Sequence, residues 1–183
     1  MTTAIFGRDN WVARLRDDVS RAVTSHGGLV LVSGEAGIGK TTLIGTAVEY
    51  ARSLGALAAV GTCSGSQGTP MLWPWIQAFR ALQRALGPAD FDALSADVGL
   101  DPTDLAALDD PDGVAFTYFD AAATLLAPIS HRHPLVVIIE DLHWADVTSV
   151  HLLTFLARHT WFERILVIGT YRDTEIDPGR EAH

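Results

Sequence analysis

Positive charge and cysteine are both scarce in this sequence of 183 residues. Only 13 Lys and Arg stand against 22 Asp and Glu, which gives a formal net charge of −9. The chain therefore lacks the basic surface that binds DNA or an anionic membrane, and we expect it to bind neither directly. Its single cysteine, Cys63, excludes an internal disulfide and is typical of a protein from the reducing cytoplasm.

Long hydrophobic runs are missing as well. No apolar run approaches the roughly 20 residues that a membrane-spanning helix requires, and residues 1–5 lack the cationic start and apolar core of a signal peptide. We therefore expect a cytoplasmic location. Lysine is almost absent too, because Lys40 is the only one and every other Lys/Arg position holds arginine. That one lysine lies in the most informative stretch of the chain.

The stretch 29–42 combines an apolar run with a glycine-rich loop. Residues 29–32 predict a buried strand, residues 43–54 predict a helix, and between them stands Gly34-x-x-x-x-Gly39-Lys40-Thr41. This is the P-loop signature in the strand–loop–helix context that it requires. The alternative is a glycine-rich turn that happens to end in Lys-Thr, and the flanking strand and helix argue against it.

The residue types of this loop suit phosphate binding. Glycines allow a tight loop whose backbone N–H groups point at an anion, and the helix that follows adds its positive end. Lys40 reaches the β- and γ-phosphates, and the Thr41 hydroxyl is placed to ligate Mg²⁺. The residues predicted to bind the nucleotide here are Gly34, Glu35, Ala36, Gly37, Ile38, Gly39, Lys40, Thr41 and Thr42.

Apolar strands alternate with amphipathic helices along the whole chain. We expect strands at 29–32, 56–61, 135–139 and 165–169. We expect helices at 11–24, 43–54, 75–86, 114–129 and 146–159, and shorter ones at 90–97 and 102–108. This alternation predicts an α/β fold with a doubly wound parallel sheet. The chain fits one domain, 1–183, with an N-terminal segment at 5–28 and a nucleotide-binding core at 29–175.

The expected strand 135–139 is followed by two adjacent carboxylates, Glu140 and Asp141. In a parallel sheet it delivers them to the carboxyl edge where phosphates bind, which is the Walker B pattern. One carboxylate holds Mg²⁺ together with Thr41, and the other orients or deprotonates the attacking water. The commoner order is Asp then Glu, so the two roles stay open, although register favours Glu140 at the metal and Asp141 as base. A buried strand that ends in an acidic turn is the alternative.

The last expected strand ends in Gly169-Thr-Tyr-Arg172. In P-loop proteins of this type a polar residue at this position senses the γ-phosphate, and Arg172 has the bidentate donors for it. Thr170 is a second candidate for the sensor. Alternatively, Arg172 pairs with Asp141, Asp173 or Glu175.

Two further groups of residues favour structural roles. Asp146, with Ser149 three residues later, is typical of a helix N-cap, and we prefer this to a metal ligand. Four apolar side chains are expected to pack in the core or against another domain, because no basic groove accompanies them for base stacking. These are Trp73, Trp75, Phe79 and Leu82. Cys63 is expected to be a small buried hydrophobe.

Six segments together resemble one family, the signal-transducing ATPases with numerous domains (STAND), an AAA-like branch of the P-loop ATPases. They are Phe6-Gly-Arg-Asp9, Gly34-Glu-Ala-Gly-Ile-Gly-Lys-Thr41, Trp73-Pro-Trp75, Phe116-x-x-Phe-Asp120, Glu140-Asp-Leu-His-Trp-Ala-Asp146 and Gly169-Thr-Tyr-Arg-Asp-Thr174. Within this branch the chain is similar to the N-terminal ATPase module of large ATP-binding LuxR-type transcriptional regulators. The resemblance implies that Gly7 and Arg8 lie near the adenine, that Arg172 reads the γ-phosphate, and that the domain is a switch more than a motor.

The sequence departs from this family in two respects. Thr117 and Tyr118 stand where the family often carries arginine. Family members also continue into a fifth strand, a helical lid and further domains, in a sheet of strand order 5-1-4-3-2, whereas this chain ends at His183. We therefore expect a core truncated before the fifth strand and the lid. Its P-loop strand would lie at an exposed edge that invites self-association.

These observations predict an ATP- or ADP-binding, slowly ATP-hydrolysing switch domain that acts on other domains of a bacterial signal-transduction or transcription regulator. A P-loop small-molecule kinase is one alternative, but it would carry an arginine-rich lid and an acceptor pocket. An AAA-type remodelling ATPase is another, and it would need an arginine finger and hexamer contacts. The absence of an Asn-Lys-x-Asp guanine motif favours ATP over GTP by default.

Overall fold

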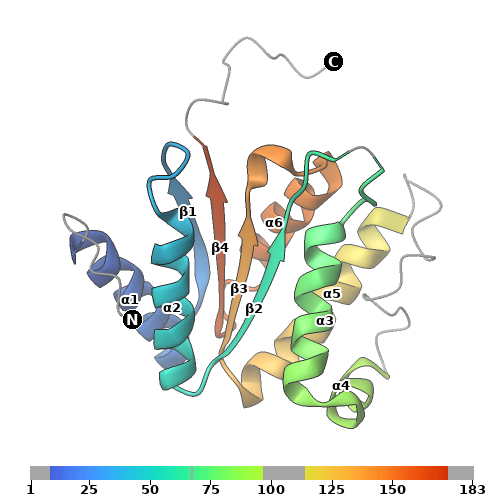
Figure 1. The fold of residues 1–183 in the computed structure, drawn as a ribbon. Coiled ribbons are helices and arrows are strands. Elements are labelled where there is room, and N and C mark those ends of the chain that lie inside the picture. The colour runs from blue at the N-terminus through green and yellow to red at the C-terminus, as the bar shows by residue number, and fades with distance from the viewer. Residues whose placement is uncertain (1–8, 67, 97–113, 173–183) are drawn as a thin grey trace.

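The structure, a computed structural model, describes residues 9–66, 68–96 and 114–172. Its centre is a four-stranded sheet in which every neighbouring pair is parallel and the strand order is β1-β4-β3-β2. The strands are β1 (Gly28–Ser33), β2 (Leu57–Thr62), β3 (Leu135–Glu140) and β4 (Ile165–Tyr171). Figure 1 shows their carboxyl ends at one edge of the sheet. The predicted doubly wound α/β fold is confirmed, and each strand lies within two residues of its expected bounds.

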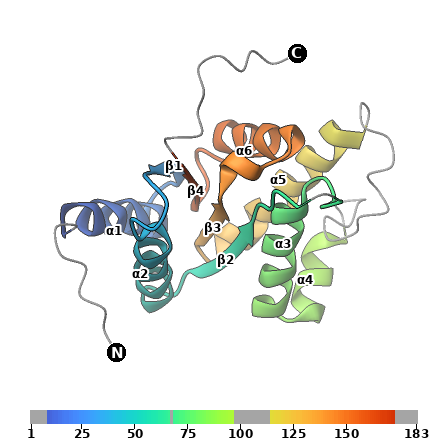
Figure 2. The same ribbon diagram turned by 45° about the horizontal axis from the view of Figure 1, so that its top comes forward.

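Helices cover both faces of this sheet (Figures 1 and 2). On one face lie α1 (Asp9–Thr24) and α2 (Lys40–Ser53). On the other lie α3 (Trp73–Leu86), α5 (Val114–Arg132) and α6 (Val147–His159), with the short α4 (Pro88–Ser95) packed against α3 and α5. The expected helix 102–108 lies outside the described residues.

Strand β3 shows why the sequence forms this sheet. Its first five residues are fully buried, as a continuous apolar run predicts for a parallel strand covered on both faces. Successive side chains alternate between the two cores: Val136 and Ile138 pack toward α1 and α2, and Val137 and Ile139 pack toward α3, α5 and α6. The sheet is therefore a rigid platform that fixes the residues following each strand.

Helix α3 packs tightly against β2. It begins at Trp73, because Pro74 is tolerated in a first turn, where its missing N–H is not needed. Trp75 and Phe79 are fully buried, which confirms the predicted core role, and the Trp75 indole donates a hydrogen bond to the Ser149 carbonyl at 3.0 Å. At Gly61 a Cβ would lie 1.8 Å from the Pro74 carbonyl oxygen, so only glycine permits this approach.

Strand β1, which precedes the P-loop, lies at one end of the strand order. It pairs with β4 on one side, and Leu31 in its middle is 52% exposed. The order β1-β4-β3-β2 agrees with the strand order that the family resemblance implies for these four strands. Within the described residues, the P-loop strand is thus an edge strand, as predicted.

Candidate nucleotide-binding site

The P-loop connects the end of β1 to the start of α2. Gly37 (φ +74°) and Gly39 (φ +90°) adopt left-handed backbone conformations that side chains disfavour, so the glycines are required by the shape of the loop. Lys40 is the first residue of α2, and its ammonium donates to the carbonyl oxygens of Gly34 at 2.6 Å and Glu35 at 3.0 Å. The lysine therefore lies folded over the loop, beside the amino end of the helix.

Glu140, the last residue of β3, lies next to Thr41 of α2. The Thr41 side chain is close enough to stabilise the charged form of the Glu140 carboxyl group. Burial raises the pKa of Glu140 above its ordinary value of 4.5, the neighbouring Asp141 charge raises it further, and the Thr41 side chain lowers it. The fold thus brings together the hydroxyl and the carboxylate predicted as metal ligands, 99 residues apart in the sequence.

This donor set fits Mg²⁺, because both groups offer the oxygen ligands that this ion prefers. Mg²⁺ usually takes only one or two protein ligands and completes its shell with phosphate oxygens and water. No group of three His, Cys, Asp or Glu within the described ranges is arranged to hold a metal by itself. The geometry therefore suits an ion that arrives with a nucleotide better than a resident metal.

Asp141 follows Glu140 in a left-handed conformation, φ +58° and ψ +47°, which is uncommon for aspartate. Its backbone N–H donates to the Thr170 hydroxyl of β4 at 3.0 Å, and its side chain remains 38% exposed. His143 Nδ1 lies 4.0 Å from its carboxylate. Such strained residues cluster at functional sites. The turn makes the chain leave the sheet directly after Glu140, so the two adjacent carboxylates occupy different environments.

Thr170 is 2% exposed, and its oxygen accepts the Asp141 bond, so it ties the end of β4 to the end of β3. Arg172, the other candidate sensor, directly follows β4 and is half-buried. Tyr171 pairs in register with Ser33, so Arg172 lies just beyond the end of the P-loop strand. Gly7 and Arg8, expected near the adenine, lie outside the described residues.

A groove of about 570 Å³ opens beside the P-loop along the free edge of β1. One wall is a face of α1 that the apolar pattern of this helix does not predict as part of a groove. It carries Trp11, Arg14, Asp18 and Arg21, spaced three and four residues apart. That helical spacing is the signal that could have identified the face, because it lies beside the core face with Leu15 and Val19. The N-terminal segment is thereby positioned next to Gly39 and Lys40.

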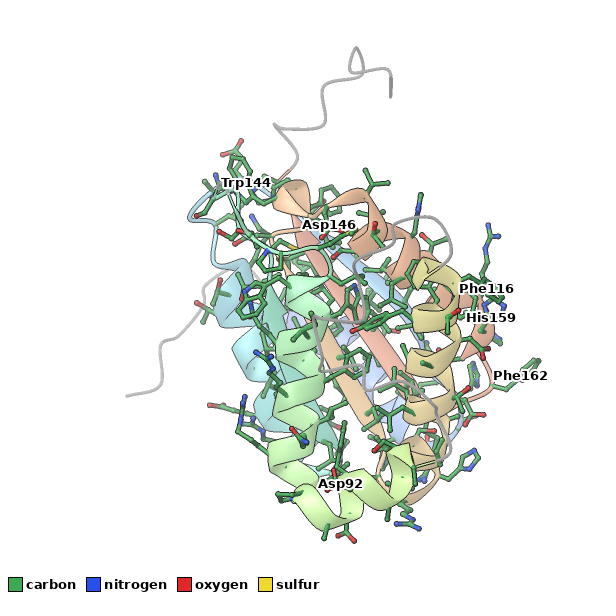
Figure 3. The ribbon with its side chains drawn as sticks, turned by 90° about the vertical axis from the view of Figure 1, so that its right-hand side faces the viewer. Asp92, Phe116, Trp144, Asp146, His159 and Phe162 are labelled. Atoms are coloured by element: carbon green, nitrogen blue, oxygen red, sulfur yellow. The ribbon has the colours of Figure 1, made fainter. Side chains whose placement is uncertain are left out.

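Asp146 caps α6 as predicted: its Oδ1 accepts a hydrogen bond from the Ser149 backbone N–H at 2.9 Å. A smaller hollow of about 190 Å³ lies next to it, between the loop after β2 and the segment after β3. Trp144, 48% exposed, and Asp146 line this hollow, and both lie beyond the carboxyl ends of the strands (Figure 3).

Cys63, which also lines this hollow, is buried and 4% exposed, as predicted. Burial, together with the charges of Asp146 and Asp141, raises the pKa of the Cys63 thiol to about 12. The thiolate is the reactive form. We therefore expect native Cys63 to resist an aromatic disulfide reagent at pH 8, whereas the chain unfolded in guanidinium should react at once. Prompt release of the coloured thiol from the native protein would contradict this burial.

The strand order, P-loop and paired carboxylates at the carboxyl edge define a P-loop nucleotide-binding core. A family model described as an AAA ATPase domain matches residues 4–168. The chain belongs to this family and is a nucleotide-binding ATPase domain. It is also 28% identical, over 186 residues, to an uncharacterized protein of Rhizobium meliloti (strain 1021). That match covers 89% of this chain but only 18% of the relative, so the chain spans less than a fifth of that protein's length.

A search of the described residues for helices long and apolar enough to cross a membrane finds none.

Proposed function

We propose that this chain is an ATP- or ADP-binding switch domain, with slow ATP hydrolysis, from a bacterial signal-transduction or transcription regulator of the STAND type. The observation that carries the proposal is the position of Thr41, in the P-loop, beside Glu140 at the end of β3. The parallel sheet brings the P-loop and the Walker B strand to one point at its carboxyl edge, where phosphates bind in such folds.

The P-loop supplies the phosphate-binding part of this site. Backbone N–H groups from Gly34 to Thr42 and the amino end of α2 face the phosphates, and Lys40 exchanges its bonds to the loop carbonyls for bonds to phosphate oxygens. Arg172, directly after β4, would contact the γ-phosphate. The family resemblance implies that Gly7 and Arg8 bind on the adenine side. Such an arrangement distinguishes ATP from ADP through the terminal phosphate.

Thr41 and Glu140 hold Mg²⁺ in this proposal, with Asp141 as the base that orients the attacking water. The bound ion supplies charge neutralisation at the phosphates. Asp141 suits the second role because its turn directs it away from the strand, and its side chain remains accessible to water. Its shorter side chain, compared with the usual glutamate, favours slow hydrolysis, as a switch requires.

The regulatory role is supported by the family resemblance and by the length of the relative. The matched region is 18% of the Rhizobium meliloti protein, so most of that chain lies outside an ATPase domain like this one. We propose that this chain likewise passes its nucleotide state to other domains of its full-length protein. No direct binding to nucleic acid or membrane is proposed, given the net charge of −9.

Calorimetric titration with ATP and with ADP, each with Mg²⁺, tests this function together with a phosphate-release assay. We expect both nucleotides to bind and the turnover to stay below about 1 s⁻¹, the lower end of the usual enzyme range. Transfer of phosphate to a metabolite would favour a kinase instead. If neither ATP nor ADP binds, the proposal is overturned for this chain.

The exposed edge of β1 supports a further proposal, that two copies of this chain associate through it. An edge strand presents unpaired backbone groups, and exposed Leu31 adds apolar surface. Leu31→Lys should therefore shift the sedimentation profile toward monomer. Phe116→Lys, which places the same charge at an exposed phenylalanine of α5, should leave the profile unchanged. Equal profiles for Leu31→Lys and the wild type would argue against pairing at this edge.

A further inference from the structure

The segment after the Walker B strand makes a short turn, residues 141–146, which we call the Walker B turn. Its 3-10 helix, η2 (Leu142–Trp144), is closed by bonds from the Trp144 N–H to the Asp141 carbonyl at 2.9 Å and from the Ala145 N–H to the Leu142 carbonyl at 3.0 Å. A backbone rotation at Asp141 would therefore break the bond that its carbonyl accepts in this turn.

Asp146, at the far end of this turn, accepts three hydrogen bonds with one carboxylate. Oδ1 accepts from the Ser149 N–H at 2.9 Å, and Oδ2 accepts from the Ser149 hydroxyl at 2.6 Å. Oδ2 also accepts from the backbone N–H of Leu72 at 3.2 Å, 74 residues away in sequence. Capping of α6 needs only the first of these bonds, and a serine in the place of Asp146 would also provide it. The bond to Leu72 is therefore unexplained by capping alone.

Leu72 ends the β2–α3 loop, which comprises the described residues 63–66 and 68–72. Leu72 is fully buried with φ +60°, and Leu72 and Asp141 are the two non-glycine residues with positive φ in the described part of the chain. The Walker B turn thus connects both strained residues: it begins at Asp141 and ends at the carboxylate that holds Leu72. Strained positions persist only where their surroundings hold them.

Further contacts fasten the same two segments. At Gly65 a Cβ would lie 2.5 Å from the Trp144 ring, so the indole rests directly on the loop backbone. The Thr148 hydroxyl, just after the turn, lies 3.0 Å from the Met71 sulfur. The main chain adds a bond from the Cys63 N–H to the Glu140 carbonyl at 2.9 Å. The Walker B turn and the residues that flank it, from Glu140 to Thr148, are therefore in contact with the β2–α3 loop.

We propose that Asp146 is a positioning residue for the Walker B carboxylates, a role that rests on the proposed ATPase function. Its bond to Leu72 holds the Walker B turn against the β2–α3 loop and so fixes the orientation of Asp141. Asp146 itself touches no substrate.

The test compares Asp146→Ser with Ser149→Ala. Serine at 146 keeps a cap for α6 but has one side-chain oxygen and cannot also hold Leu72. Alanine at 149 removes the hydroxyl bond to the same carboxylate and leaves the Leu72 bond in place. Amide hydrogen exchange on the nucleotide-free full chain reports the turn directly. Asp146→Ser should speed exchange at Leu72 and also at Trp144 and Ala145, whereas Ser149→Ala should leave all three as in the wild type.

Kinetics provide the second readout. In Asp146→Ser we expect kcat for ATP hydrolysis to fall roughly tenfold to a hundredfold. This is the loss typical of residues that hold a metal ligand in place without touching the metal. The affinity for ATP should change little, because the P-loop is untouched. A purely structural role would instead lower thermal stability without separating kcat from nucleotide affinity.

Gly65→Ala disturbs the same contact from the loop side without touching the cap, and serves if Asp146→Ser does not fold. It should also speed exchange at Trp144 and Ala145. Unchanged exchange at these two amides in a folded variant would overturn the inference, even if Leu72 alone exchanged faster. If the wild type binds no nucleotide, the proposed function fails, and the exchange comparison still decides whether Asp146 positions the turn.

Discussion

Replacing Lys40 with alanine should weaken the binding of both ATP and ADP by about a hundredfold, equivalent to about 2.7 kcal/mol. The ammonium lies over the P-loop, held by the Gly34 and Glu35 carbonyls at 2.6 and 3.0 Å. A phosphate oxygen that takes the place of these carbonyls gains a charge-assisted bond, which alanine cannot supply. Calorimetric titration with each nucleotide measures the loss. Fold integrity should be kept, because the bonds that are lost lie at a solvent-accessible loop.

Arg84→Ala provides the matched control for this experiment. It removes the same unit of positive charge from an exposed position in the last turn of α3, away from the loop. In a chain with a net charge of −9, any change in general attraction for the nucleotide should be shared by both variants. Equal losses of affinity in Lys40→Ala and Arg84→Ala would show that Lys40 makes no specific phosphate contact.

The single lysine also permits a chemical test in the wild type. Lysine-selective acetylation can modify only Lys40 and the terminal amine, so the terminal amine serves as an internal reference. Bound nucleotide should protect Lys40 and leave the terminal amine unaffected. Acetylation of Lys40 at the same rate with and without saturating ATP and Mg²⁺ would contradict the proposed contact.

The sequence predicts the sheet well because strands β3 and β4 are continuous apolar runs between clear breaks. Their parallel register then brings Glu140, Thr170 and the P-loop to one edge without further information. The P-loop is predictable for a similar reason, since glycines at left-handed positions are visible in the sequence itself. Strand positions and motif residues are thus local properties that a single sequence carries.

Other parts of the site depend on contacts between distant segments. The left-handed conformation of Asp141 has no local signal, because aspartate adopts many backbone conformations and only the bond to Thr170 shows what holds this one. The bond from Leu72 to Asp146 joins residues 74 positions apart, and no spacing rule predicts it. The groove face of α1 with Arg14 is not predictable in this way, because apolar periodicity identifies only the buried side of a helix.

Substitutions in the Walker B pair give the second large effect, because variants of Glu140 and of Asp141 should lose different activities. Asp141→Asn should lower the rate of phosphate release by roughly a hundredfold or more and leave ATP affinity nearly unchanged, because it removes a base. Glu140→Gln should weaken the Mg²⁺-dependent part of ATP binding, because Glu140 lies beside Thr41. Titration with and without Mg²⁺, together with phosphate release, separates the two. Exchanged phenotypes would reverse the assignment of metal ligand and base.

The same variants should differ in stability without nucleotide. Burial and the Asp141 charge raise the pKa of Glu140 above 4.5, so the folded chain holds this proton more tightly than the unfolded chain. The free energy of unfolding therefore falls as the pH rises from about 4.5 through the raised pKa, because ionised Glu140 is disfavoured only in the folded state. Glu140→Gln has no carboxyl group to ionise and keeps this stability. Its melting temperature should therefore exceed that of the wild type at pH 7.5 but not at pH 4.

Asp141→Asn removes the charge that repels ionised Glu140 but leaves Glu140 buried. Its melting temperature at pH 7.5 should therefore lie between those of the wild type and Glu140→Gln. Calorimetric melting curves at the two pH values measure this order. A Glu140→Gln variant less stable than the wild type at pH 7.5 would mean that Thr41 stabilises the charged carboxylate by more than burial and repulsion destabilise it. The expected order instead describes a site whose carboxylates destabilise the empty fold, as a site built for the proposed cation would.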